Sequence, residues 1–281
     1  MLKFNRNLSI IIDMNKIILR AYAKINLSLE ILGRRSDGYH NLRSIFQAVD
    51  LFDTLAIAKM KRDFILTGSK ICDDKNNLIV KAHEAMEKFV GKKMACAIHL
   101  TKVIPIAAGL GGGSSDAAAT IIGLNKLFDA KLDKRDLIKI ALTIGSDVPY
   151  FVSGYGRARV GGRGEIIKRD LGKSAKFYVL ARSHKRISTK AVFDLYDKEK
   201  KPFIDLVSKL CTKTKEIYQY LSSQSKECGL SGSGPTVFAG FSSYVIAKRV
   251  IEKHGITRFN GDFFIVRPVD RPIFTNDESM C

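Results

Sequence analysis

The sequence predicts a two-domain protein built of both strands and helices. Its 281 residues exceed the length of one typical domain, and 46% of them are hydrophobic, enough for a sizeable core. Strand-like and helix-like segments occur in both halves. A glycine-rich segment at residues 154–164 separates the halves, and clustered glycines favour loops. We therefore predict domains at residues 1–164 and 165–281.

Strand signals dominate the first part of the chain. Residues 17–32 and 44–58 alternate apolar and polar side chains, which indicates strands on a half-buried sheet, and the Gly, Ser and Asp content of residues 33–38 favours a turn between them. Residues 77–90 have the period of an amphipathic helix, with Asn76 or Asn77 as its cap. A strand at residues 96–103 then leads the chain into Pro105.

Helices are predicted next, over residues 114–128 and 132–144. The first has apolar residues three and four apart and Ser114, Ser115 or Asp116 as caps, and the second ends at Gly145. Residues 146–156 are expected to form a loop.

The second half opens with a predicted strand at residues 177–181. Helices are expected near residues 190–196, 203–221 and 244–253, a tight hairpin within residues 230–241 and a strand at residues 262–266. We expect the tail from Asp270 to be loosely ordered.

The chain is strongly basic, with 47 lysines and arginines against 28 acidic residues and a formal net charge of +19. Such a balance raises the question of a nucleic-acid partner. The basic residues are spread over almost every segment, however, without an RNP motif or a Cys/His finger. We interpret the charge as a lysine-rich solvated surface that steers anionic substrates, and we do not expect nucleic acid as a partner.

The five cysteines are scattered and form no C-x-x-C pair, which indicates neither a disulfide framework nor a zinc site and fits a reducing cytoplasm. No apolar run approaches the roughly 20 residues of a membrane span. Asp13 and Asn15 interrupt the apolar patch near the N-terminus before a signal peptide is complete. We expect a cytoplasmic protein in which residues 1–13 are an extension, with Met14 as an alternative start to Met1.

Residues 105–119, PIAAGLGGGSSDAAA, are the most informative stretch. A loop nearly free of side chains lets backbone N–H groups converge, and the following helix adds the positive end of its dipole. The stretch lacks the Gly-Lys-Ser/Thr ending of a P-loop, and Ser114 replaces the third glycine of G-x-G-x-x-G. It predicts an anion site of another type, with phosphate as the expected anion. Its expected members are Pro105, Ile106, Ala107, Ala108, Gly109, Leu110, Gly111, Gly112, Gly113, Ser114 and Ser115.

Three segments together resemble the motifs of the GHMP kinase superfamily, which includes the galactokinases and the homoserine, mevalonate and phosphomevalonate kinases. They are YAKINLSLEILGRRSDGYH at residues 22–40, PIAAGLGGGSSDAA at 105–118 and LSGSGPTVFA at 230–239. With GSDVPYF at 145–151, they are similar to the bacterial kinases that use ATP to phosphorylate the 2-hydroxyl of 4-diphosphocytidyl-2-C-methyl-D-erythritol in the non-mevalonate isoprenoid pathway. The resemblance covers roughly residues 17–266.

The resemblance implies a fold of two α+β domains. The N-terminal domain would be similar to a ribosomal protein and hold ATP on the glycine loop. The C-terminal domain would be a ferredoxin-like α/β sandwich that completes the substrate cleft.

Transfer of a γ-phosphoryl group to an alcohol needs a polyphosphate cradle, nearby positive charge and a group that accepts the hydroxyl proton. By resemblance, Asp147 accepts this proton, and Lys24 lies beside it and neutralises charge on the transferring group. Taken alone, an Asp before Val-Pro also suits a turn, and a single lysine on a strand also suits a solvated face. ATP and Mg²⁺ are the expected cofactors. Ser114 or Ser115 could add a hydroxyl to phosphate or Mg²⁺, and firm metal ligands stay unassigned.

Tyr39 and His40 follow the GRRSDG loop, and an aromatic face beside an imidazole suits stacking on a nucleobase and pairing with its edge. By resemblance, Asn26 contacts the substrate, and Phe193 sandwiches the cytosine opposite Tyr39. Both aromatic residues also suit an ordinary core. The resemblance assigns further substrate contacts to Thr189, Gly232, Ser233 and Gly234, and adenosine contacts to Asn77 and Lys102.

Two alternative hypotheses stay open. A GHMP kinase of the homoserine or mevalonate type would share the loop, but the Tyr39-His40 pair and the Asp147 segment argue against it. A basic nucleic-acid-binding protein would explain the charge, but it would not need a glycine loop at a helix start. A small-molecule substrate is the expected partner, and the sequence fits a monomer as well as a homodimer.

Overall fold

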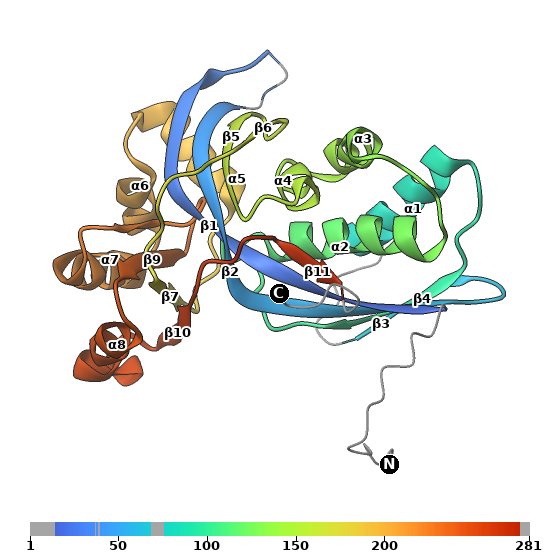
Figure 1. Ribbon diagram of the computed structural model, residues 1–281. Coiled ribbons are helices and arrows are strands. Elements are labelled where there is room, and N and C mark those ends of the chain that lie inside the picture. Colours follow the sequence, from blue (N-terminus) through green and yellow to red (C-terminus); the bar gives the residue numbers. More distant parts are fainter. Residues whose placement is uncertain (1–14, 37, 39, 69–75, 276–281) are drawn as a thin grey trace, which may run out of the picture.

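The structure of the protein is a computed structural model that describes residues 15–36, 38, 40–68 and 76–275 (Figure 1). The predicted N-terminal extension, with Met1 and Met14, lies outside the described residues. None of the helices among the described residues is long and apolar enough to cross a membrane.

The first of two sheets has seven strands in the described part of the chain, with the long strands β1 and β2 at its centre. At one end of β2 the strand order is β11-β1-β2-β4-β3. At the other end β5 pairs with β2, and β6 pairs with β5. All pairs are antiparallel except β3 with β4. The strands are β1 (Lys16–Arg34), β2 (His40–Lys59), β3 (Phe64–Gly68), β4 (Cys96–Thr101), β5 (Arg157–Gly162), β6 (Ile166–Arg169) and β11 (Ile273–Thr275).

Four helices cover one face of this sheet (Figure 1). They are α1 (Leu78–Val90), α2 (Gly112–Leu127), α3 (Lys134–Ile144) and α4 (Val148–Ser153). Leu19, Leu55 and Ile57 of the sheet pack with Ile121 and Leu124 of α2 in one buried apolar cluster. This burial is the main stabilising contribution of the layer.

The start of α1 is confirmed, because the Asn77 side chain caps the helix by accepting the Ile79 N–H at 2.9 Å. The predicted start of the next helix is wrong. α2 begins at Gly112, and Gly111 caps it in the left-handed conformation without a side-chain bond, so Ser114, Ser115 and Asp116 lie inside the helix. The backbone N–H groups at this end are therefore left to a ligand or solvent.

The loop expected at residues 146–156 contains the short helix α4, a correction to the sequence prediction. Pro149 lies in its first turn, where a missing N–H costs no hydrogen bond, and all six residues of α4 are buried. A helix of six residues is too short to show a helical period in its sequence. Because α4 is buried on all sides, it also lacks the alternation of polar and apolar faces that would indicate a helix.

The second sheet has four described strands in the order β10-β7-β9-β8, all antiparallel. They are β7 (Phe177–Ser183), β8 (Cys228–Leu230), β9 (Thr236–Phe241) and β10 (Gly261–Val266). The helices of this half are α5 (Thr189–Glu199), α6 (Phe203–Leu210), α7 (Thr212–Gln224) and α8 (Tyr244–Phe259). The single helix expected at residues 203–221 is wrong, because the backbone is extended at Cys211 and separates α6 from α7.

The chain passes from the first sheet to the second between Arg169 and Phe177. The predicted boundary at residue 164 falls in the turn between β5 and β6, both of which belong to the first sheet. The domain division stays a prediction. The described part of the tail is not loose as expected, because β11 returns to pair with β1 at Leu19–Ala21. Residues 276–281 lie outside the described residues.

An apolar cluster joins the two sheets. Ala23 and Ile25 of β1 pack with Leu110 of the glycine loop and with Tyr178 and Phe238 of the second sheet. β1 is thus covered on both faces over residues 21–26, all of which are buried. The polar side chains within that run, at residues 24 and 26, are consequently held in a site shielded from solvent.

Candidate active site

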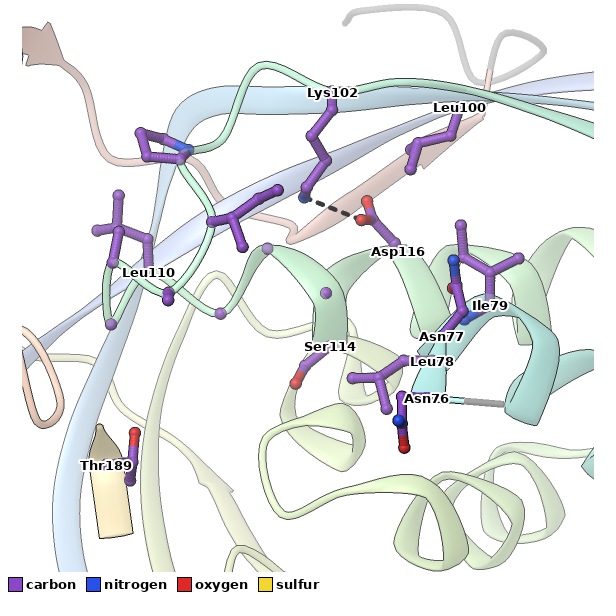
Figure 2. Close-up of a pocket in the computed structure, with 18 residues that line it drawn as sticks. Asn76, Asn77, Leu78, Ile79, Leu100, Lys102, Leu110, Ser114, Asp116 and Thr189 are labelled. Atoms are coloured by element: carbon purple, nitrogen blue, oxygen red, sulfur yellow. Dashed lines mark hydrogen bonds and ion pairs between the residues drawn. The ribbon is translucent and has the colours of Figure 1, made fainter. Parts of the chain in front are cut away.

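The glycine loop borders a cavity of about 490 Å³, a size that suits a small-molecule ligand (Figure 2). The residues predicted to hold ATP gather here: residues 105–114, Asn77 and Lys102 all line the cavity. Ser115 does not, because it is fully buried inside α2. Thr189, predicted to contact the other substrate, lines the same cavity from the second half of the chain.

Two glycines of the loop sit where no side chain would fit. Gly109 has a φ of +76°, and a Cβ there would lie 2.1 Å from the carbonyl oxygen of Ser231. Gly111 has a φ of +70°, and its Cβ would lie 3.1 Å from the Lys24 side chain and 3.0 Å from the Phe151 ring. The absence of side chains lets the loop approach both the third motif and Lys24.

Lys24 and Asp147 form an ion pair beside this loop, with Nζ 3.3 Å from Oδ2. The Lys24 side chain is only 4% exposed, and its backbone N–H donates to the Leu110 carbonyl at 2.9 Å. Irregularities in the β1–β2 pairing occur on both sides of Lys24, after Tyr22 and after Asn26. Such bulges redirect side chains next to functional sites.

The carboxylate of Asp147 is available for chemistry. Asp147 immediately precedes α4, yet its side chain makes no capping hydrogen bond and is 34% exposed. Lys24 therefore pairs with a carboxylate that is one-third exposed, and neither side chain is among the residues that line the cavity. The catalytic role of the pair stays a prediction.

A hydrogen-bond network holds the lysine from behind. Lys24 Nζ donates to Asn26 Oδ1 at 2.7 Å and lies 4.6 Å from the centre of the Phe46 ring, and Asn26 Nδ2 donates to Ser44 Oγ at 3.0 Å. Ser231, in the third motif, donates its hydroxyl to the Gly109 carbonyl at 2.9 Å. Asn26, itself held by Ser44, and the Phe46 ring fix the direction of the Lys24 ammonium. Ser231 links the second half of the chain to the loop.

The third motif reaches the same point. A Cβ on Gly232 would lie 3.6 Å from Lys24 Nζ and 3.6 Å from Asn26 Oδ1. Ser233 shares a hydrogen bond of 2.9 Å with the Thr189 hydroxyl, and Gly234 has a φ of +76°. The structure thus brings the third-motif residues and Asn26 together with the proposed catalytic pair.

His40 and Phe193, each predicted to contact the substrate, lie against each other. Their rings stack with centroids 5.0 Å apart, and His40 Nε2 lies 2.8 Å from Asp197 Oδ1. The His40 hydrogen bond lowers the pKa of Asp197. Tyr39 lies outside the described residues, so its pairing with Phe193 around a cytosine stays a prediction.

Lys102 is engaged by two buried acids beside the loop. Its ammonium lies 2.9 Å from Asp116 Oδ2 (Figure 2). It also contacts Asp53 closely. Burial raises the pKa of Asp116 to about 8, against the attraction of Lys102 and with a further increase from Asp53. Although burial opposes its charge, the two carboxylates raise the pKa of Lys102, which is therefore an ammonium.

Sequence reasoning missed Asp53, Phe46 and Asp197. Asp53 had a detectable signal, because it shares the alternating positions of the apolar residues Leu51 and Leu55 and so had to face inward. An acid on the buried face of a strand needs a partner. Phe46 and Asp197 carried no local signal that separates them from an ordinary core aromatic and a surface acid.

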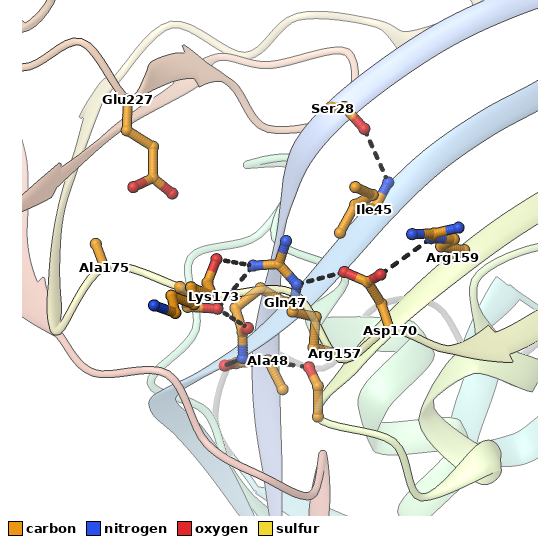
Figure 3. Close-up of polar contacts among 12 residues, drawn as sticks. Ser28, Ile45, Gln47, Ala48, Arg157, Arg159, Asp170, Lys173, Ala175 and Glu227 are labelled. Carbon is orange, nitrogen blue, oxygen red and sulfur yellow. Dashed lines mark hydrogen bonds and ion pairs between the residues drawn. The ribbon is translucent and has the colours of Figure 1, made fainter.

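A second ion-pair cluster lies where the chain passes between the sheets (Figure 3). Asp170 accepts hydrogen bonds from Arg157 Nε at 2.6 Å and from Arg159 Nε at 3.0 Å. Arg157 also donates to the Lys173 carbonyl and to Ser174, whose hydroxyl donates to Gln47. The bond from Arg157 is the main reason that the pKa of Asp170 is lowered. These bonds hold the segment between Arg169 and Phe177 against the first sheet, and none of the residues in the cluster lines the cavity.

A loop that presents backbone N–H groups at the start of α2, beside a buried lysine paired with an aspartate, fits the site of a phosphotransferase of the GHMP kinase class. The model of the GHMP kinases N terminal domain matches residues 77–155, which include the loop, α2 and Asp147. A solved homoserine kinase from Cytophaga hutchinsonii shares the fold, with a TM-score of 0.74 at 17% identity over 96% of this chain and 100% of that one.

More similar relatives narrow the class. A 4-diphosphocytidyl-2-C-methyl-D-erythritol kinase of Caldicellulosiruptor saccharolyticus is 34% identical over 93% of this chain and 100% of its own length. One from Clostridium botulinum is 33% identical over 89% of this chain and 99% of its own. A crystal structure of 4-(cytidine 5'-diphospho)-2C-methyl-D-erythritol kinase superimposes with a TM-score of 0.73 at 27% identity, covering 89% of this chain and 98% of that chain. The chain belongs to the 4-diphosphocytidyl-2-C-methyl-D-erythritol kinase family.

Proposed function

We propose that this protein transfers the γ-phosphoryl group of ATP to the 2-hydroxyl of 4-diphosphocytidyl-2-C-methyl-D-erythritol. Family membership supports the reaction, and the observation that carries it is the Lys24–Asp147 pair held against the glycine loop. The alternatives of a homoserine-type kinase and a nucleic-acid-binding protein are not favoured by the relatives.

The proposed mechanism assigns each part of the site one task. The loop N–H groups and the start of α2 bind the phosphates of the substrate ATP. Asp147 accepts the proton of the acceptor hydroxyl while the hydroxyl oxygen forms a bond to the γ-phosphorus of ATP. The bond between that phosphorus and the oxygen that bridges it to the β-phosphorus breaks, and ADP leaves with this oxygen. Lys24 offsets the charge that builds up on the transferred group, and its ion pair orients the Asp147 carboxylate.

Mg²⁺ is included in the proposal as the companion of ATP. The described residues contain no group of three or more His, Cys, Asp or Glu side chains arranged to hold a metal ion. Mg²⁺ usually keeps several waters and binds to substrate phosphates with few protein ligands. The residues present therefore fit an ion that arrives with the nucleotide, where it would offset phosphate charge, better than a resident metal centre.

The acceptor side of the cleft is proposed to bind the cytidylyl group. Asn26, Thr189 and the third motif converge on the catalytic pair, and the stacked His40 and Phe193 offer a flat aromatic wall. We further propose that the enzyme works in the cytoplasm as a monomer or homodimer. The free thiols of Cys96, Cys211 and Cys228 fit a reducing compartment.

An acceptor comparison tests the reaction. ATP consumption is measured with 4-diphosphocytidyl-2-C-methyl-D-erythritol, homoserine and mevalonate at equal concentrations, and only the first should be phosphorylated. Product analysis should place the phosphate on the 2-hydroxyl. Faster turnover of homoserine or mevalonate, or salt-dependent RNA binding without any phosphoryl transfer, would contradict the proposal.

Replacement of the catalytic acid tests the mechanism. Asp147→Asn should lower kcat by about 10³-fold, because it removes the proton acceptor, while ATP affinity measured by calorimetry changes little. Asp129→Asn, the same change at an exposed aspartate far from the loop, is the control and should behave as the wild type. Near-normal kcat in Asp147→Asn would exclude the proposed role.

A further inference from the structure

Three ionisable side chains are buried beside the glycine loop, and the proposed mechanism gives none of them a task. Asp53 of β2 is fully buried, Lys102 follows β4 and Asp116 belongs to α2. Both acids face the Lys102 ammonium. Burying such a group is costly to the free energy of folding. Stability alone therefore gives no reason for the arrangement.

Asp53 also holds the backbone at the start of the loop. Its Oδ1 accepts the N–H of Val103 at 2.6 Å and the N–H of Ile104 at 2.8 Å, immediately before Pro105. Its Oδ2 accepts from the Lys102 ammonium. One carboxylate thus fixes both the path of the chain into the loop and the side chain of Lys102.

Lys102 carries this restraint to the other end of the loop. Its ammonium donates to Asp116 Oδ2 at 2.9 Å, within the first turns of α2. A Cβ on Gly112 would lie only 2.8 Å from Lys102 Nζ, so the ammonium rests against the first residue of that helix. Lys102 also lines the cavity. The ammonium is therefore close to the helix end that receives a phosphate.

We propose that Asp53 is a positioning residue of the nucleotide site, which acts through Lys102 to hold the glycine loop and the lysine ammonium in the geometry that binds ATP. This inference rests on the proposed function, since it takes the cavity to be the ATP site. Asp53 itself is covered by the chain and does not touch the nucleotide. Its effect is therefore expected on ATP affinity rather than on the acceptor substrate.

The test uses Asp53→Asn in the full chain. Asparagine keeps an oxygen for the Val103 and Ile104 N–H groups but loses the charge that holds Lys102. Loss of a charged hydrogen bond predicts that ATP binds about tenfold more weakly by calorimetry, without acceptor present. The KM for the cytidylyl substrate should stay within about twofold of the wild type.

The control is Asp50→Asn, on the same strand. Asp50 is exposed and accepts one backbone N–H, from Arg267 at 2.6 Å, so the substitution is chemically identical but lies away from Lys102. Its ATP affinity should equal that of the wild type.

A double-mutant cycle with Lys102→Met distinguishes positioning from a general structural role. If Asp53 acts through Lys102, Asp53→Asn should weaken ATP binding in the wild type but add less than about twofold in the Lys102→Met background. Equal losses in both backgrounds, equal rises in both KM values, or unchanged ATP affinity would each overturn the proposal. If Asp53→Asn does not fold by circular dichroism, Asp53→Ser, which keeps a hydroxyl oxygen as an acceptor and also lacks the charge, replaces it in the same cycle with the same criteria.

Failure of this inference is separable from failure of the proposed function. Calorimetric ATP binding does not depend on which acceptor the enzyme uses, so the cycle can be completed even if the cytidylyl substrate is not turned over. Conversely, normal turnover of that substrate with unchanged ATP affinity in Asp53→Asn would leave the function standing and remove the role of Asp53.

Discussion

Gly109→Ala tests whether the loop works by bringing bare backbone against the third motif. Alanine at a φ of +76° is strained by about 1–2 kcal/mol. In addition, its Cβ would lie 2.1 Å from the Ser231 carbonyl oxygen. Relieving that overlap requires the two backbones to separate by about 1 Å, because a Cβ essentially never comes closer than 3.0 Å to another heavy atom.

A displacement of that size predicts a large functional loss. Misplacing catalytic groups by about 1 Å can cost about 10²-fold in rate, and the Ser231 hydroxyl would also lose the Gly109 carbonyl as its acceptor. We expect kcat/KM for ATP to fall by about 10²-fold or more. The free energy of unfolding should fall by more than the strain alone.

Gly91→Ala is the matched control. Gly91 has a φ of +71° at the end of α1, but a Cβ there meets nothing within 4 Å. It should lose about 1 kcal/mol of stability from strain and keep normal kinetics. Urea unfolding and steady-state kinetics on both variants separate strain from displacement. Kinetics of Gly109→Ala within about threefold of Gly91→Ala would refute the reasoning.

Two further predictions concern Asp197 and Asp170. Asp197→Asn should raise the KM for the cytidylyl substrate about tenfold without changing the KM for ATP, because it weakens the 2.8 Å bond that holds His40 against Phe193; an equal change in both KM values would count against it. For Asp170, whose pKa is lowered from 3.8 in the fold, the stabilisation is complete above that value and is lost as pH falls through the lower folded pKa. The difference in unfolding free energy between the wild type and Asp170→Asn should therefore be constant above about pH 5 and shrink below about pH 4, as measured by urea titrations at each pH; a difference that is the same at pH 3 and pH 7 would contradict this account.

Much of the secondary structure could be predicted because its signals are local. Alternation revealed β1, β2 and β4, and Asn77 marked the start of α1. The predictions failed where tertiary contacts decide. The short α4 is buried throughout, and β11 exists because β1 offers it an unpaired edge to bind. Neither contact leaves a periodic trace in the sequence.

The residues predicted to hold ATP line one cavity, apart from Ser115, and the binding of a nucleotide there stays a prediction. The motif spacing could not show that Ser115 is turned into the core, because that depends on α2 starting at Gly112 rather than at the serines. It also could not reveal Asp53 as the partner of Lys102, since Asp53 belongs to β2 and Lys102 follows β4.

The sequence by itself determined the class of chemistry: a glycine loop of the kind that suits anions, an alternating strand interrupted by Lys24 and an acid before Val-Pro, in an order shared with one kinase family. Only the tertiary structure decided which charges meet. The register of β1 on β2, with its bulges around Lys24, turns that lysine toward Asp147, and the inward face of β2 places Asp53 under the loop. Local periodicity specifies which face of an element is buried, whereas ion pairs between distant segments depend on how the elements pack.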